Sequence, residues 1–118
     1  MFTTTKTEGK LIEVKVEGKI THDDYEKIIP KLEKIIEDEG AIRCLIEIPK
    51  IEGIEPQALI DDLKFDARHA RDIERCAVVT DSNMLARMTK LWGTMMPDTE
   101  VKTFSPDDRA AAEVWIRG

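Results

Sequence analysis

Apolar and polar residues alternate along the segment "KLIEVKVEG", residues 10–18. A strict period of two places every second side chain on the same face of a β-strand. Three aliphatic residues share one face and three charged residues share the other, namely Ile12, Val14 and Val16 against Glu13, Lys15 and Glu17. The pattern predicts a half-buried strand whose charged face meets water. The threonine-rich segment 2–7 before it favours an edge strand that pairs with it.

A helical period begins near residue 21 and ends near residue 40. Its apolar positions recur at spacings of three and four, at Tyr25, Ile28, Ile29, Leu32, Ile35 and Ile36. Thr21 followed by Asp24 resembles a capping box, and Gly40 suits the position just after a helix. Pro30 lies inside the pattern. We therefore expect the helix to lose one backbone hydrogen bond and to kink near its middle.

Strands and helices alternate along the rest of the chain. Short apolar runs predict strands at residues 41–48, 75–80 and 100–104. Proline and serine at first-turn and capping positions predict helices at residues 57 to about 73, 81–96 and 105–117. The order β-β-α-β-α-β-α-β-α predicts a single α/β domain over residues 1–118, with a mixed, mainly parallel five-stranded sheet and four helices.

Composition narrows the class of protein. A chain of 118 residues with 42% hydrophobic and 36% charged residues is typical of a soluble globular domain with one core. The net charge of −6 disfavours contact with a phosphate backbone, so we expect no nucleic-acid partner. No apolar run approaches the roughly 20 residues of a membrane span. The N-terminus lacks the apolar core of a secretory signal, and we expect a cytoplasmic protein.

The nucleophiles of the chain give little support to covalent catalysis. Cys44 and Cys76 lie in predicted strands outside any C-x-x-C pair, so we expect reduced, buried thiols. Ser82 and Ser105 occupy N-cap positions, which explains both residues. The sequence contains no G-x-S-x-G, no glycine-rich phosphate loop and no dinucleotide fingerprint, and we expect no cofactor.

The predicted helix at residues 57–73 carries the strongest candidate chemistry. Its apolar stripe consists of Leu59, Leu63, Ala67, Ala70 and Ile73. Asp62, Asp66 and His69 share one flank of this stripe, and Phe65 lies beside that flank. Asp66 points close to the middle of the stripe. It needs a partner there, because burying an unpaired carboxylate costs several kcal/mol.

Two interpretations of this cluster stay open. Two carboxylates and an imidazole on one helix face suit a metal ion or an acid–base pair formed by Asp66 and His69. The chain offers no second group of ligands, however, and no nucleophile stands beside the pair in sequence. The alternative is that Asp66 pairs with His69 or with an arginine and fixes the helix against the sheet. We assign no catalytic residue and no metal-binding residue.

The predicted helix at residues 81–96 is rich in methionine. Its broad apolar band consists of Met84, Met88, Leu91, Trp92 and Met95. Such a band either packs on the sheet as core or forms an adaptable binding surface, because methionine is flexible and polarizable. Gly93 weakens the helix by about 1 kcal/mol relative to alanine, which favours a helix that moves. Trp92 beside Met95 and Met96 also suits weak contact with a membrane interface.

Three segments and the order of elements resemble a known family. The segments are "EGKITHDDYEKIIPKLE", "IEGIEPQALIDDLKFDARHARDIERCAVV" and "SPDDRAAAEVWI". They resemble the SpoIIAA-like family, whose members are STAS-related domains that are also compared with the CRAL-TRIO fold. The resemblance covers nearly the whole chain. It implies the fold above, self-association as a homodimer, and a binding role in which some members hold an apolar ligand between shifting helices and the sheet.

The resemblance also places one regulatory position. STAS relatives that act as anti-sigma-factor antagonists carry a phosphorylated serine at the start of the helix after the third strand. Residues 54–57 match that position, and no Ser or Thr occurs between Pro49 and Phe65. A switch by phosphorylation therefore cannot operate at this position in this chain.

Three functions remain open. The first, which we expect, is a non-catalytic module that binds an apolar small molecule or lipid near the carboxyl ends of the strands, with at most peripheral membrane contact. Its expected ligand-binding residues are Asp62, Phe65, Asp66, His69, Met84, Met88, Trp92 and Met95. The second is a protein-interaction domain of the STAS kind. The third is a small enzyme centred on Asp66 and His69.

Overall fold

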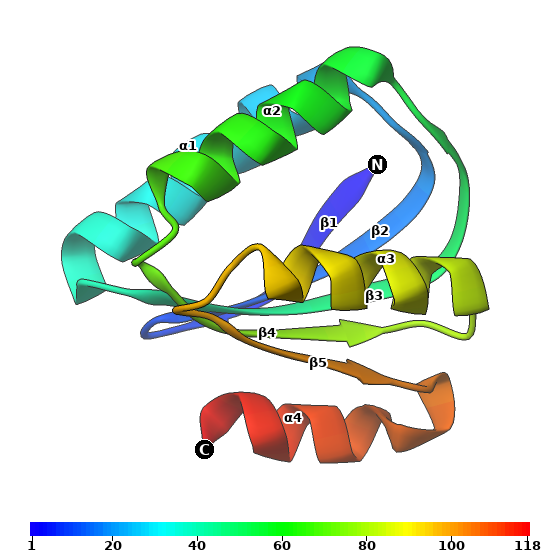
Figure 1. Cartoon of the computed structure of the whole chain (residues 1–118). Helices are drawn as coiled ribbons and strands as arrows, with labels where there is room; N and C mark the ends of the chain where they lie inside the picture. The colour runs from blue at the N-terminus through cyan, green and yellow to red at the C-terminus, as the bar shows by residue number, and fades with distance from the viewer.

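The computed structural model describes residues 1–118 and contains one sheet of five strands. The strands are β1 (Phe2–Glu8), β2 (Leu11–Ile20), β3 (Ile42–Ile54), β4 (Ile73–Val79) and β5 (Glu100–Phe104). They lie in the sheet in chain order, with β1 antiparallel to β2 and every later pair parallel. This arrangement, seen in Figure 1, confirms the predicted mixed, mainly parallel sheet.

The four helices divide unequally between the two faces of the sheet. α1 (His22–Glu39), α2 (Pro56–Arg68) and α3 (Asn83–Thr94) each connect two parallel strands. Right-handed crossovers in a sheet that runs in chain order place their helices on the same face. Figure 1 shows α1, α2 and α3 together on one side of the sheet. α4 (Arg109–Arg117) follows β5 after a short 3₁₀ turn and covers the opposite side alone.

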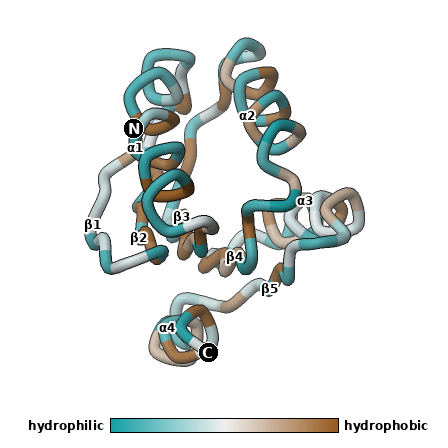
Figure 2. The backbone as a smooth tube through the Cα atoms, turned by 90° about the vertical axis from the view of Figure 1, so that its left-hand side faces the viewer, coloured by the Kyte–Doolittle hydropathy of each residue, from teal (hydrophilic) through white to brown (hydrophobic).

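The sheet separates two apolar cores. Ile12 and Ile42 are fully buried in the core under α1, α2 and α3. Leu45 and Ile116 are fully buried in the core under α4. Since side chains alternate between the two faces of a strand, β3 supplies residues to both cores. Figure 2 shows the apolar residues concentrated along the central strands, between the layers of helices.

Local sequence signals set both ends of α1, as predicted. The Asp24 N–H donates to the Thr21 hydroxyl, and the Thr21 N–H donates back to the Asp24 carboxylate, which completes the capping box. Gly40 follows the helix with a φ of 79°, a left-handed conformation that glycine adopts without steric cost. The helix continues through Pro30, which is exposed to solvent.

Two predicted boundaries are wrong. α2 ends at Arg68 and not near residue 73, because Ile73 begins β4 and pairs with Ile42 in the sheet. The apolar position at Ile73 therefore belongs to a strand. β3 continues to Ile54, through residues that were expected to form a loop, because the second half of β2 keeps pairing with it.

The burial of Glu13 contradicts the prediction that the charged face of β2 meets water. Its side chain is only 4% exposed, because α4 approaches this part of the sheet. The guanidinium of Arg109, in the first turn of α4, lies 3.3 Å from the Glu13 carboxylate and balances its charge. Lys15 is half-buried and Glu17 is exposed, so the charged face meets water only toward the end of the strand.

Candidate functional site

A partly buried polar network joins α1, α2 and α3 above the sheet. Asp62 and Asp66 lie one turn apart on α2. The Tyr25 hydroxyl on α1 donates to Asp62 over 3.1 Å. The Trp92 indole N–H on α3 donates to Asp66 over 2.8 Å. Because the two carboxyls stand one turn apart on α2, these two hydrogen bonds link the three helices through that helix.

Burial changes the titration of this network. It raises the pKa of Asp66 to about 8, and the charge of Asp62 acts in the same direction. The hydrogen bond from Trp92 opposes the shift only in part. Burial followed by the charge of Asp62 also raises the pKa of the Tyr25 phenol, which therefore remains a donor. Asp66 is thus a neutral acid near neutral pH.

Two thiols lie beneath these carboxyls. Cys44 on β3 is directly opposite Cys76 on β4. Burial raises the pKa of Cys44 to about 12 and the pKa of Cys76 well above its usual value. Because the thiolate is the reactive form, both residues are inert at neutral pH.

His69 stands apart from this network, which makes the predicted pairing of Asp66 with His69 or an arginine wrong. Since α2 ends at Arg68, the imidazole of His69 turns away from the flank that Asp66 occupies. Its Nε2 lies 3.0 Å from the Glu33 carboxylate on α1, and its Nδ1 lies 2.9 Å from Asp72. The ring also packs against Phe65, with 4.7 Å between the ring centroids. The arrangement provides no His–Asp pair for acid–base chemistry at Asp66.

An exposed apolar surface flanks the network. More than half of the side chain is exposed at Met84, Met88 and Leu91 on α3 and at Met95, the C-cap residue, and the helix has no buried residue. On α2, Leu59, Ile60 and Leu63 are exposed as well. We call these seven residues the α2–α3 apolar surface. The two sets belong to the two helices that the Trp92–Asp66 hydrogen bond joins.

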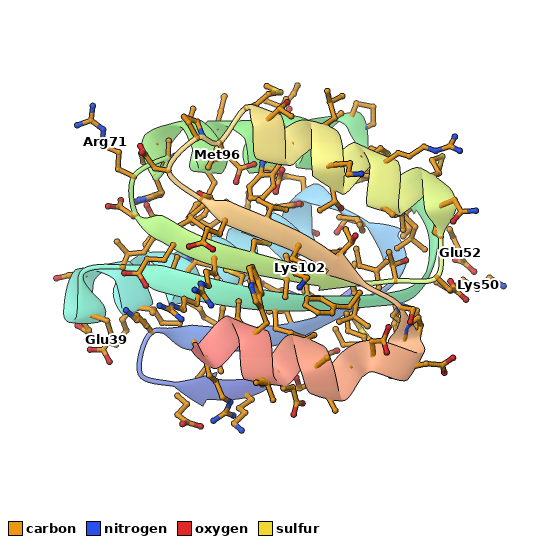
Figure 3. The ribbon with its side chains drawn as sticks, turned by 60° about the horizontal axis from the view of Figure 1, so that its bottom comes forward. Glu39, Lys50, Glu52, Arg71, Met96 and Lys102 are labelled. Atoms are coloured by element: carbon orange, nitrogen blue, oxygen red, sulfur yellow. The ribbon has the colours of Figure 1, made fainter.

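The exposure of these residues contradicts two expectations about how α2 and α3 pack on the sheet. The predicted stripe of Leu59 and Leu63 does not face the sheet, because Ala58, Phe65 and Asp66 occupy the inner side of α2. α3 packs inward mainly through Trp92 and through Met96, which lies in the turn between α3 and β5 (Figure 3). Leu85 is half-buried, and the other large apolar side chains of α3 stay in solvent.

Two hollows of the molecule lie away from this surface. One of about 340 Å³ lies between α3 and β5, and its lining residues are Lys90, Gly93, Thr94, Thr99, Val101, Lys102 and Thr103. Val101 is the single hydrophobic residue of this lining, which therefore does not suit an apolar ligand. A second hollow, of about 120 Å³, lies between β1 and α1. Neither includes Trp92, which is one of the expected ligand-binding residues.

The structure brings together only part of the expected ligand-binding set. Asp62, Asp66 and Trp92 join one network, and the expected methionines Met84, Met88 and Met95 belong to the α2–α3 apolar surface. Tyr25 was missed, although a tyrosine on the buried side of a helix needs a partner for its hydroxyl. No group of three or more His, Cys, Asp or Glu side chains is arranged to hold a metal ion.

Comparison with known proteins places the chain in a family. The sequence model of the SpoIIAA-like family matches residues 11–117. The chain belongs to the SpoIIAA-like family. Among curated proteins, no sequence matches it.

Two solved structures share the SpoIIAA-like fold of the chain. An uncharacterized protein of the DUF3478 family from Shewanella loihica PV-4 is 28% identical, with a TM-score of 0.78 over 98% of this chain and 92% of that one. The anti-sigma factor antagonist SpoIIAA, in its unphosphorylated form, is 11% identical, with a TM-score of 0.65 over 98% of both chains. At that identity, the second match shows the fold alone.

The start of α2 differs from the phosphorylated position expected of STAS relatives. Glu55 is the N-cap residue of α2, followed by Pro56 in the first turn. The Glu55 carboxylate accepts a hydrogen bond from the His22 N–H at the start of α1, over 2.9 Å. A carboxylate within residues 54–57 thus joins the starts of two helices, in the segment where the resemblance to STAS relatives implied a serine.

Proposed function

We propose that the protein is a non-catalytic module that binds lipid at a membrane surface through the α2–α3 apolar surface. The observation that carries the proposal is the exposure of four large apolar side chains on α3 and its C-cap residue, which range from 53% for Met88 to 66% for Leu91. Exposed apolar residues grouped on adjoining elements mark interaction sites, whereas single exposed residues are ordinary. The SpoIIAA-like fold supports a non-enzymatic module.

The charges of α3 favour an anionic lipid surface as the occupant. The chain as a whole carries a net charge of −6, but α3 contains Arg87 and Lys90 and no acidic residue. A helix with an exposed apolar face and only basic charges lies in the plane of a membrane interface. None of the four helices has the length and hydropathy needed to cross a bilayer. The contact we propose is therefore peripheral.

Sedimentation with lipid vesicles tests the proposal. The wild type is expected to sediment with vesicles of phosphatidylcholine mixed with phosphatidylglycerol, and less with phosphatidylcholine alone. Leu91→Glu removes a side chain whose burial contributes about 1.5–3 kcal/mol, so the affinity falls about tenfold or more. Val114→Glu is the matched control, because Val114 is 73% exposed on α4, on the opposite face. This control keeps the wild-type affinity.

Two results count against lipid binding. Equal sedimentation of the wild type and Leu91→Glu shows that α3 is not the contact. If neither vesicle binds the wild type, and native mass spectrometry shows a homodimer that Leu91→Glu converts to a monomer, the surface serves self-association. That second result supports the alternative of a protein-interaction domain.

A further inference from the structure

Asp62 and Asp66 are two acids one turn apart on α2, and each accepts a hydrogen bond from a different helix. The Tyr25 hydroxyl donates to Asp62, and the Trp92 indole donates to Asp66. Two ionised carboxylates only accept hydrogen bonds and cannot bond to one another. One shared proton turns Asp66 into a donor toward Asp62 and gives an unbroken chain of donors and acceptors across three helices.

No positive charge near the pair replaces this proton. Neither Asp62 nor Asp66 takes part in any of the ion pairs of the structure. The titratable groups that face the pair are neutral or acidic, namely Tyr25 on α1, Cys44 on β3 and Cys76 on β4. α3 contributes only the Trp92 indole. On α2 itself, Asp61 turns toward His22, and beyond the helix end His69 turns toward Glu33 and Asp72.

We propose that Asp62 and Asp66 share one proton in the folded protein and that loss of this proton releases α3 from α2. When the proton leaves to water, two negative charges remain one turn apart in a site where Asp66 is 8% exposed. Like charges in such a site repel each other and must be hydrated. This proton-dependent release of α3 does not depend on what the α2–α3 apolar surface binds.

α3 is the helix that moves aside when water enters the site. It has no buried residue, whereas α1 and α2 contribute Ile28, Ala58 and Phe65 to the core. Its polar link to α2 is the hydrogen bond from Trp92 to Asp66. Displacing α3 therefore costs less buried area than displacing either neighbour. The carboxyl pair thus acts as a proton-dependent latch on this helix.

The two indole N–H signals of ¹⁵N-tryptophan-labelled protein test the shared proton. The Trp92 signal is expected to shift with a midpoint near pH 8, the value to which the pKa of Asp66 is raised. The Trp115 signal serves as an internal control, because Trp115 packs against Phe104 and Arg75 on the α4 face. Assignment follows from Trp115→Phe. A shift of the Trp92 signal in the ordinary aspartate range, near about pH 4, would overturn the proposal.

Two isosteric variants separate a shared proton from a structural role. Asp66→Asn keeps an acceptor for Trp92 and a donor for Asp62 but cannot ionise, so the titration of the Trp92 signal disappears. Asp62→Asn removes the neighbouring charge, so the midpoint moves to lower pH. Asp72→Asn, which touches His69 and not the pair, leaves the midpoint unchanged. A titration that persists in Asp66→Asn contradicts the assignment.

Amide hydrogen exchange tests the release of α3. Above the midpoint, and after correction for the intrinsic effect of pH, the α3 amides are expected to lose protection while the α4 amides keep theirs. In Asp66→Asn, the protection of α3 does not change across the same range. If the Trp92 signal titrates but α3 keeps its protection, the pair shares a proton without acting as a latch, and the proposal fails.

Discussion

At the scale of single residues, Asp66 shows how surroundings decide the charge of a carboxyl. It is buried, it receives one N–H from Trp92, and its other neighbour is a second acid. On a surface the same residue is ionised at neutral pH and contributes nothing to the cohesion of three helices. Here the neutral form is the one that fits the network.

Asp66→Asn is expected to change how stability depends on pH. The pKa of Asp66 is about 8 in the folded protein, above the value of about 3.9 of an unfolded chain. Because the unfolded state loses its proton first, the free energy of unfolding of the wild type falls as pH rises between these values. The amide of the Asp66→Asn variant does not ionise, so the variant lacks this loss. At about pH 9 it is more stable than the wild type by on the order of 1–3 kcal/mol.

Urea unfolding at about pH 5 and about pH 9 checks this expectation through the difference between the two proteins. Asp72→Asn controls for the loss of an acidic residue at the same end of α2. The expectation is contradicted if the difference in stability between wild type and Asp66→Asn is the same at both pH values.

At the scale of elements, Pro30 makes α1 less stable than the same helix would be without a proline. The residue lacks an N–H and lies in the interior of a continuous helix of 18 residues. Its side chain is exposed, so replacing it removes no core packing. Pro30→Ala is expected to stabilise the protein by on the order of 1–2 kcal/mol, since the restored helix outweighs the greater freedom of the unfolded chain.

Thermal unfolding followed by circular dichroism measures this gain as a rise of several degrees in the midpoint. Lys31→Ala is the matched control, because Lys31 is the exposed neighbour and alanine differs little from lysine in helix propensity. A midpoint of Pro30→Ala equal to that of the control would show that α1 already accommodates the proline at no cost.

The sequence predicted the ends of some elements and not of others. The difference depends on how far apart in the chain the residues lie whose interactions fix each end. α1 was predicted at both ends, because the capping box and Gly40 act within a single turn. The end of α2 was not predicted, because Ile73 belongs to the sheet. It pairs there with Ile42, which lies 31 positions earlier in the chain. The exposure of Leu59 and Leu63 also escaped prediction, because helical periodicity identifies an apolar stripe but not its direction.

At the scale of the whole molecule, Arg109 and Glu13 tie the C-terminal helix to the N-terminal half of the sheet. The two residues are 96 positions apart, and the Glu13 carboxylate is nearly inaccessible to water. One of its oxygens has no hydrogen-bond partner, so the guanidinium is the main compensation for its charge. Arg109→Ala is expected to destabilise the protein by on the order of 2–4 kcal/mol, because it leaves this buried charge unpaired.

A double-mutant cycle with Glu13→Gln, read out by urea unfolding, checks this expectation. The double variant loses less than the sum of the single variants, because the neutral amide no longer needs the guanidinium. Arg117→Ala is the control, since its pair with Glu8 is exposed and contributes about 0–1 kcal/mol. Additive losses in the cycle would mean that the two side chains act separately.

The candidate site is a property of the whole molecule as well, which explains why it was predicted only in part. The sequence singled out Asp62, Asp66 and Trp92 separately on two helices. The Trp92–Asp66 contact spans 26 positions and depends on how α3 crosses the sheet. Periodicity placed Asp66 next to His69, but the turn after Arg68 separated them. Spacing along one helix does not foresee partners from another.

The chain-order arrangement of the strands has a consequence for assembly. Each new strand pairs with the one made just before it, so the sheet can extend in the direction of synthesis without waiting for distant segments. α4 follows all five strands in the chain. Until it docks, Leu45, Ala77, Val79 and Phe104 form a bare apolar face on the growing sheet. The period before α4 docks is therefore when the nascent protein is most prone to aggregate.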